Sequence, residues 1–334
     1  MQSRYYHFKM IKLIFKLFAV FSIMALLPGC NFTGMAASEI PRENSAEPSV
    51  YFCPGEDCGK IMEQSINSAK KYAYCAFYDL DLKNVINSLS LKSKTSDVKI
   101  VMDSSTYESQ ISGNGLRQDN NNQLMHNKFC VIDDETVVTG SFNPTFNDNF
   151  RNNNNLVVIH SGHLASNYKD EFAELWEGDF GEGGGVKTPS IFLNGNLIEN
   201  YFCPEDECAS KVIEETVKAQ KSIYFMTFSF TNEQIADSII KKRGIDVRGI
   251  FDASQASSKY SQLERMKGFG LDVKKDSNKY KLHHKVFIID NETVVTGSFN
   301  PTASGDGKND ENILIFHDKA IAEKYLDEFD RLWE

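Results

Sequence analysis

The chain contains the same histidine–lysine pattern at two places, and this pattern can do chemistry. The pattern H-x-K-x4-D is formed twice, by His126, Lys128 and Asp133 and by His283, Lys285 and Asp290. Both copies continue into the same ten residues, T-V-V-T-G-S-F-N-P-T. Two imidazoles can divide the roles of nucleophile and acid between them, and two lysines can bind the anion on which they act. The doubled pattern therefore predicts an enzyme that acts on a phosphodiester.

The residues around each motif are suited to holding phosphate oxygens. Alternate residues of a strand point to the same face, so the histidine and lysine of each motif are expected to project together. A hydroxyl and an amide follow each motif, and the predicted phosphate-binding side chains are Ser141, Asn143, Ser298 and Asn300. A neutral imidazole can attack phosphorus to give a phosphohistidine, and a protonated imidazole can serve the leaving oxygen. The sequence has no carboxylate cluster and no Walker-type loop, so neither a metal nor another cofactor is expected.

The whole chain is a tandem repeat. Residues 51–54 return at 201–204, and residues 168–177 return at 325–334, with both tryptophans at these matched ends. The copies differ widely elsewhere, whereas the identical stretches concentrate at the motifs, which favours a functional role for the motifs. If the copies pack about a pseudo-twofold axis, one cleft contains both sets of residues. We therefore expect a monomer that builds its site from two domains.

Within each copy, apolar strands alternate with amphipathic helices, which predicts an α/β sandwich with a mixed sheet. The first domain is expected over 50–177 and the second over 200–334, joined by a glycine-rich linker at 178–199. Extra residues in the second copy, 263–275, are expected to add one helix and one strand. In the first copy, helices are expected at 61–69, 82–91 and 164–176, and strands at 72–78, 98–102, 128–132, 136–140 and 156–160.

The N-terminus resembles an export signal. Residues 1–30 have basic residues first, then a short apolar run and the ending L-P-G-C. This ending resembles a bacterial lipoprotein signal, which implies cleavage before Cys30 and lipid attachment to its sulfur. Ordinary signal cleavage near 35–37 and an uncleaved anchor that starts near Ile11 are the alternatives. With 31–49 as a flexible tether, we expect an exported lipoprotein anchored to a membrane of a bacterial cell envelope, or else a secreted protein.

Four of the seven cysteines recur as C-x4-C pairs. In an exported protein this predicts two local disulfides, Cys53–Cys58 and Cys203–Cys208. One four-cysteine zinc site is the alternative, although the spacing matches the usual zinc ligands poorly. Two further cysteines align with phenylalanines of the other copy and are interpreted as inert buried thiols: Cys75 and Cys130.

The motifs resemble those of the phospholipase D superfamily, whose signature is H-x-K-x4-D followed by G-S-x-N. The resemblance covers about residues 50–334 and is specific because the motif is doubled. It implies an α/β sandwich in which two halves share one site, a covalent phosphohistidine and no dependence on a metal. It also implies that His126 is the nucleophile and that His283 is the general acid.

The family often carries a glutamate in an N-x-E-N context, which orients a motif histidine. The second copy has Glu311 at this position, and the first copy has Asn154 instead. A carboxylate beside His283 would favour its imidazolium form, and an amide beside His126 would not, which fits the two implied roles. Two roles stay open for the motif aspartates, as turn residues that hold local structure or as direct participants in binding: Asp133 and Asp290.

The motif identifies the bond and leaves the substrate open. The net charge is −10, and the first 29 residues carry four basic and no acidic residues, so the rest of the chain carries −14. This charge and a membrane anchor favour phospholipid, with release of phosphatidic acid. Nucleic acid is the second hypothesis, because the copies are compact and several basic residues could line a groove: Lys241, Lys242, Arg243, Lys274, Lys275, Lys279 and Lys281. A non-catalytic binding protein of the envelope is the third hypothesis.

Overall fold

The first copy of the repeat forms its own mixed β-sheet. The computed structural model describes residues 39–107, 115–120 and 122–334, so the expected signal peptide and Cys30 lie outside the described residues. The strand order of the first sheet is β2-β8-β7-β6-β3-β4-β5, with β3, β4 and β5 parallel and the other pairs antiparallel. The strands are β2 (Ser49–Cys53), β3 (Tyr72–Phe77), β4 (Asp97–Met102), β5 (Leu116–Gln118), β6 (Lys128–Ile132), β7 (Thr136–Gly140) and β8 (Asn154–His160).

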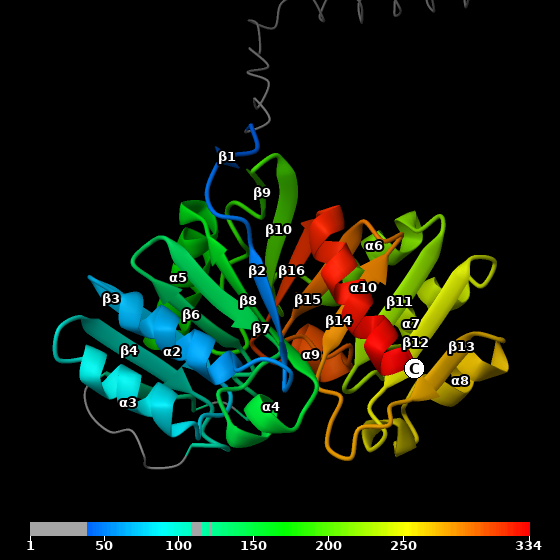
Figure 1. Cartoon of the computed structure of the whole chain (residues 1–334), viewed down its shortest axis with the longest axis horizontal. Coiled ribbons are helices and arrows are strands. Elements are labelled where there is room, and N and C mark those ends of the chain that lie inside the picture. The colour runs from blue at the N-terminus through cyan, green and yellow to red at the C-terminus, as the bar shows by residue number, and fades with distance from the viewer. Residues whose placement is uncertain (1–38, 108–114, 121) are drawn as a thin grey trace, which may run out of the picture. The chain divides into compact units, whose positions relative to one another are not determined.

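The second copy repeats this sheet and extends it by two strands. Its strand order is β1-β9-β10-β16-β15-β14-β11-β12-β13, in which β10 to β13 match β2 to β5 by position (Figure 1). The strands are β1 (Arg42–Glu43), β9 (Ser190–Leu193), β10 (Asn196–Cys203), β11 (Ser222–Thr227), β12 (Asp246–Phe251), β13 (Asp272–Lys275), β14 (Lys285–Ile289), β15 (Thr293–Gly297) and β16 (Glu311–His317). Two mixed sheets of equivalent topology confirm the predicted tandem α/β architecture.

Helices cover both faces of each sheet, so the central strands are buried at every position. In the first half they are α2 (Cys58–Ser68), α3 (Lys83–Lys92), α4 (Phe146–Phe150) and α5 (Gly162–Glu177). In the second half they are α6 (Cys208–Lys218), α7 (Glu233–Ile240), α8 (Leu263–Gly268), α9 (Ala303–Gly307) and α10 (Lys319–Trp333). Among the described helices, none combines the length and the apolar character needed to cross a bilayer.

One hydrophobic core joins the two halves. The helix α5 begins where Ser161 caps the backbone N–H of Leu164 and ends at Gly178, which has a φ of 102°. Its buried face, including Tyr168 and Phe172, packs into the same cluster as Tyr325 of α10. This cluster also contains apolar residues of both sheets, and residues 40–334 form a single compact unit. The two domains expected from the sequence are therefore two halves of one folded body.

Reciprocal hydrogen bonds across the centre display the pseudo-twofold relation. The Thr139 hydroxyl of β7 donates to Asn312 Oδ1 of the other half over 3.0 Å. The Thr296 hydroxyl of β15 donates in the same way to Asn155 Oδ1 over 3.2 Å. Both pairs link equivalent positions of the repeat in opposite directions, as a twofold axis between the sheets requires.

Two segments expected to be irregular contain strands instead. From the predicted tether, β1 pairs in parallel with β9, and from the predicted linker, β9 and β10 form a hairpin. The hairpin turns at Asn194 and Gly195, which have φ values of 52° and 90°. An Asn-Gly pair with positive φ at both residues is the preferred two-residue hairpin turn, so the sequence does contain a signal for this hairpin. The predicted tether and linker are therefore wrong for residues 42–43 and 190–199.

The extra segment of the second half contains the expected helix α8 and strand β13. The strand is not an addition, however, because β13 pairs with β12 as β5 pairs with β4 in the first half. The sequence missed β5 because it is short and only partly buried.

Within the described residues, six cysteines form three disulfides. Two are the predicted local pairs, Cys53–Cys58 and Cys203–Cys208. The third joins Cys75 to Cys130, so the interpretation of these residues as separate thiols is wrong. The reason is the register of β3 and β6, which places Cys75 directly opposite Cys130. Phenylalanines at the equivalent positions of the second half correctly indicated burial and concealed the pairing.

Candidate active site

Backbone hydrogen bonds across the two halves bring the motif histidines together. The backbone N–H of His126 donates to the carbonyl of Asp310 over 3.0 Å. The backbone N–H of His283 donates to the carbonyl of Asn153 over 2.7 Å. Asn153 and Asp310 are equivalent positions of the repeat, each just before the strand β8 or β16. Each motif is therefore held by the opposite half, next to the pseudo-twofold axis.

The histidine and lysine of each motif meet at the start of a strand. The strands begin at Lys128 and Lys285, so the histidines precede the strands and do not lie on them as the sequence had suggested. Lysine Nζ donates to the carbonyl of its own motif histidine, over 2.6 Å in the first half and 2.7 Å in the second. All four side chains are buried.

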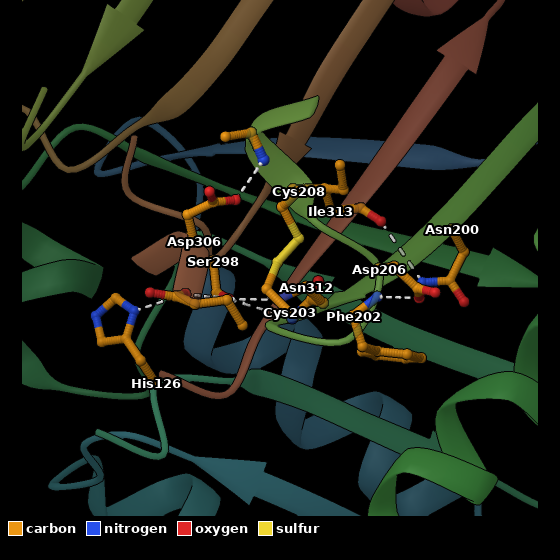
Figure 2. Close-up of a disulfide and its surroundings, with 12 residues drawn as sticks. His126, Asn200, Phe202, Cys203, Asp206, Cys208, Ser298, Asp306, Asn312 and Ile313 are labelled. Carbon is orange, nitrogen blue, oxygen red and sulfur yellow. Dashed lines mark hydrogen bonds and ion pairs between the residues drawn. A yellow bond between two sulfur atoms is a disulfide. The ribbon is translucent and has the colours of Figure 1, made fainter. Parts of the chain in front are cut away.

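Each motif histidine faces a carboxylate of the opposite half. Glu311 Oε2 accepts a hydrogen bond from His126 Nδ1 over 2.8 Å, and the Ser298 hydroxyl donates to the same oxygen over 2.6 Å. The prediction that Glu311 lies beside His283 is therefore wrong. Figure 2 shows His126, Ser298 and Asn312 in one view with the Cys203–Cys208 disulfide, which joins the end of β10 to the start of α6. Glu311 reaches His126 because the carbonyl of the preceding residue, Asp310, accepts a hydrogen bond from the backbone N–H of His126. This hydrogen bond holds the start of β16 against the first motif.

The carboxylate that faces His283 is Asp148, which the sequence analysis missed. Asp148 Oδ2 lies 3.2 Å from His283 Nδ1, at ion-pair distance but without hydrogen-bond alignment. Asp148 is on α4, whose first turn is capped by Thr145. The sequence contains one indication of this residue. Asp148 aligns with Gly305 of the other copy, so the two halves differ here in a charged side chain.

The serines and one asparagine that were predicted to bind phosphate make contacts within the protein. Ser141 Oγ accepts from the backbone N–H of Asn155 over 3.0 Å. Asn143 donates to Asp148 from both its backbone and its side-chain N–H groups. Asn300 Oδ1 is buried and has no partner among the described residues. Ser298 and Asn143 therefore support the two carboxylates, and phosphate binding by Asn300 stays a prediction.

Asp133 and Asp290 are not brought to the motif histidines. Asp133 accepts hydrogen bonds from the backbone N–H groups of residues 70–72, and Asp290 accepts them from residues 220–222. Each follows the far end of its strand, ~16 Å from the motif lysine at the usual rise per residue. Of the two roles left open, the contacts support the structural one.

An aromatic ring packs against each motif histidine. Tyr78 lies edge-on to His126 with ring centroids 4.8 Å apart, and Phe228 lies edge-on to His283 at 5.1 Å. Lys128 Nζ lies 4.9 Å from the centre of the Tyr78 ring, and Lys285 Nζ lies 5.3 Å from that of Phe228. These rings contact the edges of the imidazoles and restrict their movement. The role of the rings has no local signal in the sequence, because both residues simply follow buried strands.

Burial and clustered positive charge shift the pKa values of the motif residues. Burial, opposed by Glu311 and aided by the nearby lysines, lowers the pKa of His126 to about 4. Burial and the charge of Lys285 lower the pKa of His283 to about 3, although Asp148 acts in the opposite direction. The pKa of Lys128 is lowered by burial to about 8, and that of Lys285 is lowered by burial and by Lys128. Because both lysines act on both histidines, the four groups belong to one electrostatic site.

Metal ligands gather elsewhere in the part of the chain that the structure describes. One group of three side chains could hold an ion, formed by Glu199, Glu215 and His317. His317 already bonds Glu199 and Thr293 through its two ring nitrogens. It lies at the opposite end of β16 from Glu311, ~20 Å along the strand. Metal independence of the motif site stays a prediction.

Comparisons with known proteins agree with the arrangement of two halves. The family model described as "Cardiolipin synthase, PLD-like domain" matches residues 62–176 and 212–333. A phospholipase D of Rickettsia prowazekii is 34% identical over 136 residues, which cover 40% of this chain and 66% of that protein. A mitochondrial cardiolipin hydrolase of Xenopus laevis is 34% identical over 142 residues, which cover 41% of this chain and 68% of that protein.

These relatives are matched over about two thirds of their own length. Among solved structures, phosphatidylserine synthase of Haemophilus influenzae resembles this chain with a TM-score of 0.62, at 13% identity and over 85% of each chain. At that identity the likeness concerns the fold alone, which here extends over both halves.

Proposed function

This chain belongs to the phospholipase D superfamily, and we propose from that premise that it is a phosphodiester hydrolase with one active site. The observation that carries the proposal is the pairing of both motif histidines with carboxylates across the two halves. Glu311 bonds His126 Nδ1, and Asp148 faces His283 Nδ1. A carboxylate on Nδ1 leaves Nε2 of each imidazole available for the reaction.

In the proposed reaction, His126 Nε2 attacks phosphorus while the bond from phosphorus to the leaving oxygen breaks. A proton on His283 Nε2 passes to that oxygen, so that the alcohol leaves neutral. His283 then takes a proton from water, and the hydroxide formed attacks the phosphohistidine and restores His126. The lowered pKa of His126, about 4, keeps this imidazole neutral and nucleophilic at neutral pH.

The lysines support this reaction by binding the phosphate anion. The charges of Lys128 and Lys285 lower the pKa of both His126 and His283, so both lysines lie near both imidazoles. A phosphate bound between the imidazoles therefore contacts both lysines. The negative charge of the bound diester opposes the effect of the lysines on His283 and favours its protonated, acidic form. The assignment of His126 as nucleophile rests on the order of the motifs, since the argument from Glu311 does not apply.

We propose phospholipid as the substrate. The net charge of the chain is −10, which opposes binding of a long polyanion. The matched relatives include proteins named phospholipase D and mitochondrial cardiolipin hydrolase. A third support comes from an exposed aromatic surface close to the site.

We call this surface the aromatic ridge, and it consists of Phe146, Phe150, Arg151 and Tyr280. Phe146 and Phe150 are 49% and 54% exposed on α4, the helix whose buried side carries Asp148. The Arg151 guanidinium lies 4.9 Å from the Phe146 ring centre and 5.1 Å from that of Tyr280. A pocket of about 400 Å³ opens beside the ridge. Exposed aromatic rings around an arginine suit the interface of a bilayer with phosphate headgroups.

A specific observation also favours the nucleic-acid alternative. Lys281 Nζ lies 5.4 Å from the centre of the Phe228 ring, which itself contacts His283. A lysine that reaches the ring packed against His283, and that follows the exposed Tyr280 in the chain, suits a single strand whose bases stack on aromatic rings.

One experiment separates these functions. Purified protein is incubated in chelator with phosphatidylcholine vesicles, cardiolipin vesicles, single- and double-stranded DNA, and RNA, with His126→Ala as control. We expect lipid hydrolysis that His126→Ala abolishes. Cleavage of nucleic acid alone would replace phospholipid with the alternative, and no cleavage of any substrate would favour a binding protein of the envelope.

We further propose that the enzyme acts as a monomer attached to a membrane through Cys30. The residues that support attachment are the signal-like segment and its L-P-G-C ending. Cys30→Ser should release the protein from the membrane fraction of expressing bacteria and prevent labelling with a fatty acid. A specific activity that is independent of protein concentration would support the monomer.

A further inference from the structure

The repeat supplies one carboxylate to the site from each half, but from different positions. In the second half the carboxylate is Glu311, at the first residue of β16. Its counterpart in the first half is Asn154, which donates its side-chain N–H groups to the carbonyls of Asp148 and Asn152. In the first half the carboxylate is Asp148, whose counterpart in the second half is Gly305.

The backbone of α9 has no room for a side chain at the glycine. A Cβ placed on Gly305 would collide with the backbone oxygen of Asn300. The second half therefore cannot present a carboxylate from this helix without a shift of the backbone. In the first half, α4 carries Asp148 at this position and buries it to 3% exposure.

We propose that Asp148 is the positioning residue of His283 and performs for it the task that Glu311 performs for His126. This inference rests on the proposed function and identifies how the second motif histidine is held in the reaction. Asp148 lies on the opposite half from His283, as Glu311 lies on the opposite half from His126. The side chain of Asn154 is instead tied to its own half, since its amide N–H groups donate to the carbonyls of Asp148 and Asn152.

The two carboxylates are held by different donors. Asp148 receives N–H groups from Asn143, over 2.8 Å from both backbone and side chain, and from Asn152 over 2.6 Å. Glu311 receives one hydroxyl, from Ser298, besides the imidazole of His126. These amide donors, with His283, hold the pKa of Asp148 well below its usual range in spite of burial. Asp148 therefore stays ionised opposite His283 throughout the working range of pH.

The first test measures the imidazoles and does not need a substrate. Nitrogen-15 NMR of the full chain reports the protonated ring nitrogen of each histidine, and His283→Ala assigns the signals of His283. In Asp148→Asn we expect His283 to lose its preference for the Nδ1–H tautomer while His126 keeps its own. Glu311→Gln should give the reverse. Unchanged His283 signals in folded Asp148→Asn would overturn the proposal.

The second test is kinetic and gives the first half the residues of the second half. Asp148→Gly introduces the residue found at Gly305, and the additional change Asn154→Glu introduces the residue found at Glu311. We expect kcat to fall about 10²-fold in Asp148→Gly and Asp148→Asn with little change in KM, and to recover in part in the double variant. Asn147→Ala, on the exposed side of α4, is the control with unchanged kcat.

A purely structural role of Asp148 predicts a different outcome. Thermal unfolding would then shift in step with the loss of activity, and both the pH profile of kcat and the His283 signals would match those of wild type. This combination would overturn the proposal.

If the wild type hydrolyses none of the diesters, the proposed function fails, whereas the NMR result still decides the role of Asp148. If Asp148→Asn does not fold, the NMR comparison is made with Asp148→Glu, in which displaced His283 signals are expected and unchanged signals would overturn the proposal.

Discussion

Glu311 accepts a hydrogen bond from His126 at 2.8 Å although the two residues stand 185 positions apart, one in each half of the chain. The bond holds a proton on Nδ1 and directs Nε2 of His126 away from the carboxylate. His126, the proposed nucleophile, therefore depends on the other half of the chain for its orientation. Neither half alone contains a complete site.

Replacement of Glu311 by glutamine should slow the reaction strongly. We expect kcat to fall about 10²- to 10⁴-fold, because the amide no longer selects one tautomer of His126. Steady-state kinetics on a chromogenic phosphodiester measures the change. Ser298→Ala should cost about 5-fold, since it removes one hydrogen bond to Glu311. Its repeat counterpart Ser141→Ala is the matched control, because Ser141 bonds no carboxylate; an equal loss in both serine variants would contradict the assignment.

A trapped phosphoenzyme should carry its phosphate on His126. Rapid acid- or base-quench of the enzyme with a slowly hydrolysed diester, followed by peptide mass spectrometry, locates the phosphoryl group. We expect label on His126 in wild type and none in His126→Ala. Label on His283 alone would reverse the two roles, and its absence from both histidines would exclude the covalent route.

Binding of a diester anion should weaken as pH rises through about 8. The lowered pKa of Lys128, about 8, means that this lysine is charged below that pH and neutral above it. Dimethyl phosphate keeps one negative charge across this range, so a change in its inhibition constant reports the protein. We expect weaker inhibition at pH 9 than at pH 7, and a smaller change in Lys128→Arg, whose guanidinium stays charged. Inhibition that stays constant to pH 10 would show that the lysines keep ordinary pKa values.

The aromatic ridge should matter for vesicles and not for soluble substrates. Phe146→Ser with Phe150→Ser removes two exposed rings, each worth about 1.5–3 kcal/mol when fully buried in an apolar phase. We expect activity on vesicles to fall about 10-fold or more, with unchanged activity on a soluble diester. Phe269→Ser, which removes a ring that is 50% exposed after α8, is the control. An equal loss on both substrates would mean that the ridge supports the site and does not contact lipid.

Asp133 should be important for stability and dispensable for chemistry. Asp133→Ala removes three hydrogen bonds to the backbone at residues 70–72, and the pKa of this carboxyl is lowered by those donors in spite of partial burial. We expect the free energy of unfolding to fall by about 1–3 kcal/mol, with kcat of the folded protein unchanged. Urea unfolding and steady-state kinetics measure the two quantities. A large loss of kcat at full stability would return Asp133 to the catalytic set.

The strands that follow the motif histidines were predictable because the repeat displays them twice. The strands at Lys128–Ile132 and Thr136–Gly140 have the predicted bounds, and the turn between them contains Asp133 and Asp134, both with positive φ. A short apolar run followed by two aspartates predicts a strand and a turn from neighbouring residues alone, without knowledge of distant contacts.

The partners of the site residues were harder to predict, because they depend on contacts between the halves. Glu311 was assigned to the histidine of its own half, whereas the pseudo-twofold axis delivers it to His126. The approach of Asp148 to His283 depends on where α4 lies, and the motif contains no sign of it. The Cys75–Cys130 disulfide likewise requires the register of β3 and β6, which no local pattern contains.

The continuity of the two halves in one polypeptide gives the active site a freedom that a symmetric dimer lacks. In an assembly of two identical subunits, every substitution appears on both sides of the twofold axis. Here the carboxylate positions have diverged separately, at residue 148 in one half and at residue 311 in the other. Natural variation can therefore change the surroundings of His126 and those of His283 one at a time.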